Sequence, residues 1–401
     1  MIDFEIPAEV VALRERVRAY VQEVAIPAEA RDVSDHGLSD DLRAELQDEA
    51  RRRGIFTPQV STALGGLGLD HRGSAVILEE AGYSVLGPQG LHCAAPDEGN
   101  IHMLDVIARG EQRERYLEPL ARGEVRSCFA MTEPAPGAGS DPSMLRTRAT
   151  RVDGGWRIDG HKWFITGADG AAFAICMALA DEGATMFLID VDNPGWRIER
   201  LIEATDAAFP GGHAEVFLDD CRVGGDAVLG AVGEGFGYAQ VRLAPARLTH
   251  CMRWLGAARR AHDIALDRAN EREAFGHKLG ELGMVQERLA ESVTDIEVSR
   301  LLIWRCAWAL DRGEPARHES SLAKAFVGEA VWRVVDRSVQ ICGSLGVSGD
   351  LVLARLMNET RPFRIYDGST ETHRWAIARR ELRRRAAATG PGSPPPRSEL
   401  G

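Results

Sequence analysis

The spacing of apolar residues changes twice along the chain, and this change limits the folds that the sequence can adopt. Over residues 7–123 the apolar positions recur every three or four residues, as they do in amphipathic helices. Over 147–237 the spacing falls to two, which is typical of strands, and over 238–385 the helical spacing returns. We therefore predict an α+β protein with an N-terminal α-helical domain, a middle antiparallel β domain and a C-terminal helical bundle.

The predicted domain boundaries follow these changes of spacing. We place the three domains at residues 1–125, 126–237 and 238–386. The remaining stretch, 387–401, is rich in Gly, Pro and Ser and predicts a disordered tail.

Local signals mark individual elements within these domains. Ser39 stands where a helix N-cap is expected, Leu42, Leu46 and Ala50 follow on one face, and Gly54 can end that helix. A turn signal at 153–155 predicts a hairpin. Further strands are expected at 186–189, 196–198 and 214–218, and long helices at 240–270, 284–312, 317–342 and after 368.

Composition excludes several classes of protein. The chain has 401 residues, with 48 Lys and Arg against 60 Asp and Glu, and a net charge of −12. It contains no apolar stretch of the roughly 18 residues that a membrane span needs, and its N-terminus has no recognisable leader. The net negative charge does not favour nucleic acid as a partner, because phosphate binding needs clustered positive charge. We therefore expect a soluble, cytoplasmic protein.

The cysteines and histidines give no sign of a covalent framework or a metal site. The seven cysteines are scattered and form no Cys-x-x-Cys pair, and the 11 histidines form no His-x-x-x-His pair. This spacing favours neither disulfides nor a local metal site.

Five segments combine residue types that can bind a ligand. They are 128–134 with 137–141, 162–167, 272–276, 340–346 and 366–371. The first is a Gly-rich loop whose N–H groups can approach an anion, and Thr132 can add a side-chain hydrogen bond. The second places Phe164 and Thr166 on one strand face, where they can contact a planar ring. Taken singly, each segment also has a structural interpretation as a loop, a core strand or a helix end.

In this order and spacing, the five segments resemble the acyl-CoA dehydrogenase family, and the resemblance runs from about Pro7 to Leu382. It implies a helical domain, a β domain and a four-helix bundle, with FAD bound between the last two. It also implies α,β-dehydrogenation of an acyl thioester, on CoA or on an acyl carrier, with electrons passing to an electron-transfer flavoprotein. The family further implies a homo-oligomer, a dimer or a tetramer.

The resemblance also implies the residues of the FAD site. Thr132 would bond the pyrimidine side of the flavin, Thr166 would face its N5 atom, and Phe164 would lie against the ring. Arg272 and Phe275 would hold the FAD of a neighbouring subunit. The full set of implied FAD contacts is Phe129, Met131, Thr132, Gly139, Ser140, Phe164, Ile165, Thr166, Arg272, Phe275, Gln340, Cys342, Gly343, Ser344, Ser369 and Glu371.

Asp367 occupies the position of the family's catalytic base, in a Tyr-Asp-Gly-Ser segment where the family has Tyr-Glu-Gly-Thr. There it would take the α-proton of the substrate while the thioester oxygen is polarised, because that proton is only weakly acidic. Ser140, Arg247 and Gly368 match positions that touch the thioester or CoA. No metal is implied.

The catalytic position departs from the common pattern. Asp367 is shorter than Glu by one C–C bond, roughly 1.5 Å. Since a misplacement of about 1 Å can slow a reaction about 100-fold, the backbone or the substrate must sit differently. Some members carry the Glu just before the residue that matches Arg247, but Ala246 stands there, so no substitute base is present. The resemblance is closest to the subgroup with Asp at the catalytic position.

Three further departures concern the ligand contacts. The loop after Pro134 is two residues longer than the common pattern, which could alter the mouth of the CoA channel. Gly283 stands where many members have a Gln that contacts FAD. Ala244 stands where some members have an Asp that contacts CoA, so that a carrier other than free CoA is conceivable.

Two alternatives keep the same fold. One is an oxidase of acyl-CoA or nitroalkane that uses O₂ in place of the flavoprotein acceptor. The other is a DNA-binding flavoprotein, for which the only support is a run of arginines near the C-terminus: Arg379, Arg380, Arg383, Arg384 and Arg385. A solvated helix end explains that run better, and the net negative charge points the same way.

Overall fold

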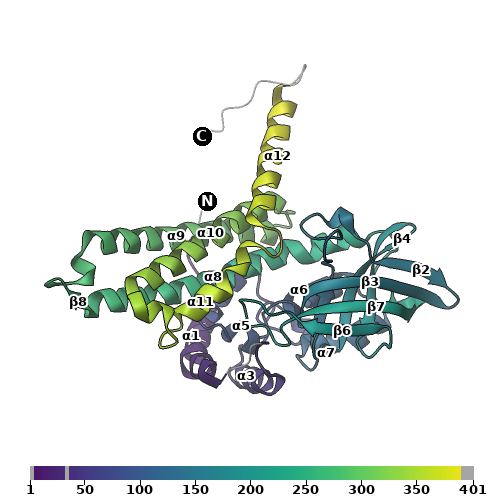
Figure 1. Cartoon of the computed structure of the whole chain (residues 1–401), viewed down its shortest axis with the longest axis horizontal. Helices are drawn as coiled ribbons and strands as arrows, with labels where there is room; N and C mark the ends of the chain where they lie inside the picture. Colours follow the sequence, from purple (N-terminus) through teal and green to yellow (C-terminus); the bar gives the residue numbers. More distant parts are fainter. Residues whose placement is uncertain (1–3, 32–35, 390–401) are drawn as a thin grey trace.

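The computed structural model describes residues 4–31 and 36–389, and it consists of two helical regions and one β region (Figure 1). The order along the chain is helices, then strands, then helices. This order confirms the predicted α+β fold. The predictions for the first three residues and for 390–401 lie outside the described residues.

The N-terminal region is helical. Its helices are α1 (Ala8–Tyr20), α2 (Ile26–Ala28), α3 (Asp40–Arg52), α4 (His71–Ala81), α5 (Gly87–Gly90), α6 (Asp97–Ile107) and α7 (Glu118–Ala121). The α4 helix packs against two helices of the C-terminal region, α8 (Gly235–Glu271) and α9 (Gly283–Asp311). The first helical region is therefore joined to the third through a shared core.

The α3 helix forms for the reasons that its sequence indicates. The Ser39 hydroxyl accepts a hydrogen bond from the Leu42 N–H at 3.3 Å, as an N-cap does. Leu42, Leu46 and Ala50 are buried on one face. Gly54 follows the helix with a φ of +64°, a conformation that glycine adopts without strain.

The middle region is a seven-stranded sheet. Its strands are β1 (Ser127–Ala130), β2 (Arg148–Val152), β3 (Gly155–Thr166), β4 (Phe173–Ala180), β5 (Gly183–Asp190), β6 (Trp196–Leu201) and β7 (His213–Gly224). They lie in the order β1-β4-β2-β3-β7-β6, and β5 pairs with β4. The predicted hairpin is the β2–β3 turn, where Gly154 has a φ of +80°.

The sheet is mixed, whereas the sequence predicts an antiparallel one. Most neighbours are antiparallel, but β1 runs parallel to β4, with Ser127 opposite Phe173. The β2 strand also meets β4 in parallel, at Arg148. The chain reaches β4 only after the β2–β3 hairpin, and such a long connection lets two strands pair in parallel.

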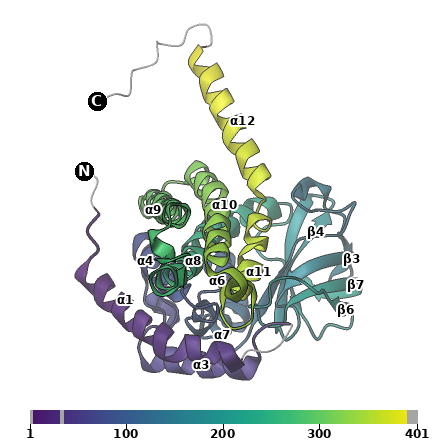
Figure 2. The same cartoon turned by 60° about the vertical axis from the view of Figure 1, so that its left-hand side comes forward.

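The C-terminal region contains the predicted long helices. It consists of α8, the short hairpin of β8 (Glu273–Ala274) and β9 (His277–Lys278), then α9, α10 (Arg317–Cys342), α11 (Leu353–Thr360) and α12 (Thr370–Thr389). The α11 helix, which has only eight residues, was not predicted from the sequence. The α12 helix packs against α10 at its start and then projects from the molecule (Figures 1 and 2). It also runs into the stretch 387–401 that was predicted to be disordered.

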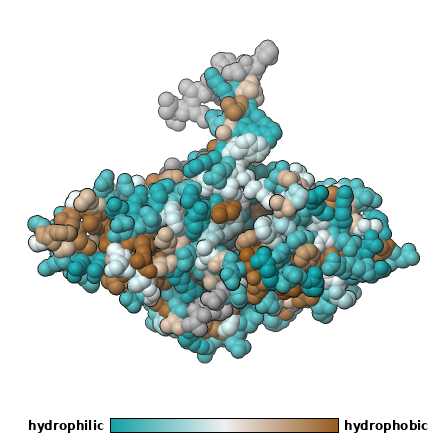
Figure 3. Space-filling view, in the orientation of Figure 1, coloured by the Kyte–Doolittle hydropathy of each residue, from teal (hydrophilic) through white to brown (hydrophobic). Residues whose placement is uncertain are grey.

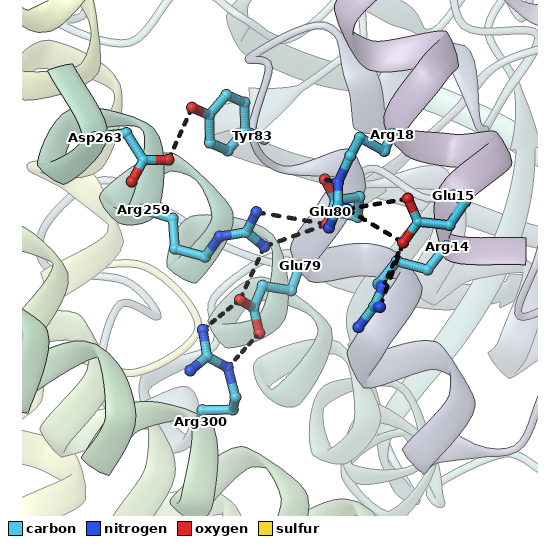
Figure 4. Close-up of polar contacts among 9 residues, drawn as sticks. All are labelled: Arg14, Glu15, Arg18, Glu79, Glu80, Tyr83, Arg259, Asp263 and Arg300. Carbon is cyan, nitrogen blue, oxygen red and sulfur yellow. Dashed lines mark hydrogen bonds and ion pairs between the residues drawn. The ribbon is translucent and has the colours of Figure 1, made fainter. Parts of the chain in front are cut away.

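An ionic network ties the two helical regions together (Figure 4). Glu79 and Glu80 of α4 are buried. Glu80 pairs with Arg18 of α1 at 3.0 Å, whereas Glu79 pairs with Arg300 of α9 at 2.7 Å and with Arg259 of α8 at 3.1 Å. Removing one partner of such a buried group costs about 3–5 kcal/mol, so this network holds the first helical region on the bundle.

Two further features follow from the described residues. Within them, no helix combines the length and the apolar character needed to cross a membrane. All seven cysteines are free and buried, as the scattered spacing predicts.

Candidate functional site

Asp367 lies on a short turn between the 3₁₀ segment Pro362–Arg364 and α12. Its φ is +53°, which is uncommon for a residue with a side chain. Two side chains hold its backbone carbonyl: Arg247 Nε donates to it at 2.8 Å, and His373 Nε2 lies 3.2 Å away. The turn that carries the predicted base is therefore fixed from both α8 and α12.

Lys324 of α10 also holds this turn in place, through hydrogen bonds to its carbonyl groups. Its side chain is fully buried, and Nζ donates to the carbonyls of Phe363 at 2.6 Å and Gly368 at 3.3 Å. Burial lowers the pKa of Lys324 to about 8. Gly368 has a φ of +95°, and a Cβ there would lie 2.7 Å from His373 Nε2, so this position requires glycine.

The Asp367 carboxylate faces an imidazole on α8. Its Oδ2 lies 3.1 Å from His250 Nε2, and the Asp367 side chain is 18% exposed. Burial alone would raise the pKa of Asp367, but the hydrogen bond from His250 and the positive charges of Arg242 and Arg247 hold it well below its ordinary value. The carboxylate is therefore charged at neutral pH, as a base must be.

On the sheet side, a buried ion pair organises the Gly-rich loop. Glu133 lies 2.9 Å from Lys162 Nζ, and its carboxylate also accepts hydrogen bonds from the N–H groups of Ala138, Arg146 and Thr147. Burial would raise the pKa of Glu133, but the charge of Lys162 and the hydrogen bonds of Thr147 lower it to about 2. One carboxylate thus folds the loop that holds the predicted Gly139 and Ser140.

The two predicted flavin-side segments lie next to each other. The Trp163 N–H donates to the Thr132 carbonyl at 3.1 Å, which joins β3 to the chain that continues β1. Phe164 has a φ of +50° and is 45% exposed. Ile165, by contrast, is buried in the core of the sheet, so its side chain cannot face a ligand on the Phe164 side.

Thr166 belongs to a chain of polar groups that the sequence did not indicate. Its Oγ1 lies 3.0 Å from His213 Nδ1, and His213 Nε2 lies 3.2 Å from Asp206 Oδ1. The next residues, Ala207 and Ala208, donate their N–H groups to Glu359 of α11. The segment beside Thr166 is thereby attached to the C-terminal region.

Arg242 of α8 connects the sheet side to the base. It is buried, its guanidinium carbon lies 4.3 Å from the centre of the Phe129 ring, and its Nε donates to Asn100 Oδ1 at 2.8 Å. Its charge also acts on Asp367. Phe129 and Asp367 therefore both lie near the same arginine.

The predicted FAD contacts that follow α8 and that end α10 lie away from the base turn. Arg272 follows the end of α8, and Phe275 sits in the β8–β9 hairpin with its ring 92% exposed. The end of α10 lies nearby, since Arg268 of α8 acts on Cys342. Figures 1 and 3 show this hairpin at the end of the bundle remote from the sheet, where apolar surface is exposed. We call Arg272, Phe275, Gln340, Cys342, Gly343 and Ser344 the distal group.

Within the distal group, exposure divides the residues. Gln340, Gly343 and Ser344 are exposed, whereas Cys342 is buried in the helical core.

Near the base, the Ser369 hydroxyl accepts a hydrogen bond from the Thr372 N–H at 3.3 Å, so Ser369 caps α12. Glu371 lies in the first turn of the same helix.

Several residues at this site were not predicted: Arg242, His250, His213, Asp206 and Lys324. The sequence offered a signal only for His250, which follows Arg247 by three positions and so shares its helix face. The roles of the others depend on contacts between segments far apart in the chain. No group of His, Cys, Asp and Glu in 4–31 or 36–389 is arranged to hold a metal ion.

The arrangement suits a flat aromatic ligand next to a base. Phe164 offers an exposed ring, Thr166 and Thr132 offer hydroxyl groups, and a charged carboxylate lies across Arg242. A carboxylate of this kind can take a proton from a carbon acid if a neighbouring group stabilises the charge that develops.

Models of known protein domains match all three regions of the chain. Residues 7–124 match the acyl-CoA dehydrogenase N-terminal domain, 128–221 the middle domain and 233–382 the C-terminal domain.

Individual relatives agree with this match. The chain is 36% identical over 402 residues to the probable acyl-CoA dehydrogenase FadE2 of Mycobacterium tuberculosis, covering 96% of this chain and 98% of that protein. It is 36% identical over 359 residues to acyl-CoA dehydrogenase family member 11 of Homo sapiens, covering 85% of this chain and 45% of that protein. The chain thus spans about half the length of this vertebrate relative.

A solved structure is similar over nearly the full chain. It is that of a putative acyl-CoA dehydrogenase from Mycobacterium abscessus, with a TM-score of 0.89 and 33% identity. The similarity covers 96% of this chain and 100% of the other.

Proposed function

This chain belongs to the acyl-CoA dehydrogenase family, and from that premise we propose that Asp367 takes the α-proton of an acyl thioester as its Cα–Cβ bond is oxidised. The family's enzymes are FAD-dependent oxidoreductases that act on CH–CH bonds. The observation that carries the proposal is the charged, largely buried carboxylate of Asp367, which lies near Arg242, the same arginine that packs on the half-buried ring of Phe129.

The residues present fit FAD. Phe164 is exposed on a strand that is otherwise packed, and the adjacent segment supplies Thr132 and Met131 at half-buried positions. A Cβ at Gly139 would meet no atom within 4 Å, so the loop leaves open space beside that backbone. When bound, FAD supplies the acceptor for the hydride that leaves the substrate.

Arg247 has the position of a substrate-binding residue. Its Nε is engaged by the Asp367 carbonyl at 2.8 Å, and its two terminal nitrogens have no hydrogen-bond partner in the described part of the chain. They are therefore available to a carbonyl or phosphate oxygen. Together with Ser140 and the Gly368 backbone, Arg247 would orient the thioester so that its α-carbon meets Asp367.

The thioester oxygen needs a donor as negative charge develops on it. The backbone N–H of Asp367 points from the same turn as the base, and this turn is held by Arg247, His373 and Lys324. Because these contacts hold the turn in place, the N–H group would need little reorganisation when the proton moves. We propose this N–H as the oxyanion donor from the protein.

The distal group supports a site shared between two copies of the chain. Arg272 and Phe275 lie at the β8 end of the bundle, away from the start of α12 (Figure 1), and Phe275 is almost fully exposed. We propose that they contact the FAD of a neighbouring subunit in a homo-oligomer, a dimer or tetramer. Electrons would leave the reduced enzyme to an electron-transfer flavoprotein.

The experiment that tests the function is anaerobic flavin bleaching by a panel of short, branched, long and aromatic acyl-CoAs. We expect at least one of them to reduce the flavin of the purified protein. If air rapidly reoxidises the reduced flavin and hydrogen peroxide forms stoichiometrically, the assigned activity is that of an oxidase and not that of a dehydrogenase. A flavin that no acyl-CoA and no acyl-carrier thioester reduces would overturn the proposal.

A further inference from the structure

His250 is a buried imidazole next to the base. It lies on α8, one turn after Arg247, and is 4% exposed. Both ring nitrogens have partners: Nδ1 lies 3.0 Å from Arg253 Nη2, and Nε2 lies 3.1 Å from Asp367 Oδ2. The ring therefore connects an arginine to the carboxylate of the proposed base.

The chemistry of these partners fixes the state of the ring. A guanidinium has N–H donors and no acceptor, so Nδ1 of His250 must accept the hydrogen bond from Arg253. The neutral ring then carries its proton on Nε2 and donates it to Asp367. Burial lowers the pKa of His250, and the charge of Arg253 lowers it further, which favours the neutral form. With both nitrogens engaged in this way, His250 has no lone pair with which to act as a base.

Arg253 is itself held in place by the N-terminal region. Its Nη1 donates to the Cys93 carbonyl at 2.6 Å and lies 3.7 Å from Glu98 of α6. Glu98 also accepts a hydrogen bond from Thr249 at 3.0 Å. Arg253 and Glu98 are both buried, so the chain of contacts that ends at Asp367 begins in a rigid part of the molecule.

The two oxygens of Asp367 differ as a result. Oδ2 faces His250, whereas Oδ1 has no hydrogen-bond partner among the residues that the structure describes. The backbone of Asp367 is already fixed by Arg247 and His373. With the backbone and one oxygen both held, the remaining oxygen has a single place to point.

We propose that His250 is a positioning residue for the base: it anchors Oδ2 of Asp367 through its Nε2–H and leaves Oδ1 to receive the α-proton. This inference rests on the proposed function. In the step itself, the substrate C–H bond breaks, an O–H bond forms at Oδ1, and the electron pair of the C–H bond moves into the forming double bond as hydride leaves Cβ for FAD. His250 keeps its proton throughout.

A short base needs this kind of support. Asp has one fewer carbon than Glu and two side-chain torsions, so holding one oxygen fixes the position of the other. The same hydrogen bond favours the charged carboxylate and keeps the base ionised where burial would otherwise protonate it. His250 thus compensates for two consequences of having Asp in a buried site.

The test compares two substitutions at His250, using FAD-loaded protein and the acyl-CoA that best reduces the wild type. His250→Gln can still accept from Arg253 and donate to Asp367, whereas His250→Met fills similar space and does neither. We expect His250→Met to reduce its flavin about 100-fold more slowly at saturating substrate, with a substrate dissociation constant within about threefold of the wild type. His250→Gln should recover most of the rate.

The pH profile of flavin reduction separates positioning from a general loss of structure. Several charged or titratable groups face His250 or Asp367: Arg253, Glu98, Arg242, Arg247, Tyr366, Lys324 and His373. His250→Met removes a donor from the carboxylate, so the acid limb of the profile should move up by about one pH unit or more. His250→Gln should keep the limb of the wild type, since its amide N–H still donates to the carboxylate.

The outcomes are distinct from those that test the function. If the wild type is reduced and His250→Met matches it in rate and in pH limb, the positioning role is wrong and Asp367 remains the proposed base. If His250→Gln is as slow as His250→Met, the hydrogen bonds are not what matters, and the proposal also fails. Should the methionine variant not hold FAD, His250→Asn serves instead, because its shorter amide cannot reach both Arg253 and Asp367.

Discussion

The base turn and the distal group differ in how completely a single chain builds them. Around Asp367, contacts from α8, α10 and α12 hold the backbone, and His250 holds the carboxylate. In the distal group, Phe275 is 92% exposed and lies far along the bundle from the sheet. Motifs that are equally clear in the sequence therefore differ in the structure. The residues around Asp367 are held by contacts within the chain, whereas those of the distal group, apart from the buried Cys342, are exposed to solvent.

This difference indicates how the implied site residues divide. Residues that need a fixed geometry for proton transfer are supported within one chain, where packing can hold them to a fraction of an ångström. Residues that contact only the ends of a long cofactor can come from another copy, because they contribute affinity and little geometry. The following predictions test this division, beginning with the largest expected effect.

Asp367→Asn should slow flavin reduction by about 1000-fold, because the amide cannot take the α-proton. FAD content should stay the same, since the turn and its backbone contacts remain. Stopped-flow absorbance under anaerobic conditions measures both. Asp336→Asn, an exposed position on α10, is the matched control and should behave as the wild type. A reduction rate close to that of the wild type would show that the base turn is not the site of proton transfer.

The junction between the segment beside Thr166 and α11 should make stability depend on pH through Glu359. Burial raises the pKa of Glu359 from its ordinary value of 4.5 to about 7, so the folded state holds this proton more tightly than the unfolded state. Its contribution to stability is therefore complete below about pH 4.5 and is lost as pH rises to about 7, a change of about 3 kcal/mol.

Denaturant unfolding at several pH values checks this expectation. The free energy of unfolding of Glu359→Gln should vary less between pH 4.5 and 7 than that of the wild type. Equal pH dependence of the two proteins would mean that Glu359 is already charged in the folded state.

Lys324→Met should weaken the base turn without touching the distal group. The carbonyls of Phe363 and Gly368 would lose their donor in a buried place, which costs about 2 kcal/mol of unfolding free energy. Flavin reduction should slow while FAD affinity is kept. Arg317→Met, at an exposed position at the start of α10, is the control. If the two variants are equally stable, the contacts of Lys324 do not support the turn.

Arg272→Ala should have the smallest effect, and it should weaken FAD binding without slowing flavin reduction. We expect FAD affinity to fall about tenfold, since one charge-assisted contact is worth about 1.5 kcal/mol. The rate of reduction in protein that retains FAD should be that of the wild type. Titration of the apoprotein with FAD gives the affinity, with Arg148→Ala on the sheet as control. A slower reduction step in fully loaded Arg272→Ala would erase the distinction between the two regions.

Most of the fold follows from local patterns in the sequence. The Ser39 cap, the buried face of α3 and the β2–β3 turn depend on neighbouring residues, and they form as predicted. The parallel pairing of β1 with β4 and the short α11 were missed, because strand order and short helices depend on contacts that no local pattern contains.

The residues of the site were likewise predicted only where a local motif marks them. Asp367, Arg247, Thr132 and Phe164 were found through motifs, but the motifs do not say what holds them. His250 supports the base only because α8 passes under the turn before α12, a contact across 117 positions of the chain. Ile165 stays a predicted FAD contact, but its side chain is buried in the core, so that contact would be made by its backbone.

Mixing two defective variants tests the central claim most directly, namely that the base turn and the distal group of one chain belong to two different sites. Asp367→Asn lacks the base, and Arg272→Glu should repel a diphosphate at the distal group, so each alone should be nearly inactive. When the two are unfolded and refolded together, hybrid oligomers should recover about a quarter of wild-type activity, since half of the dimers are hybrids and each has one intact site. Hybrids that form, carry both chains and stay inactive would contradict the account.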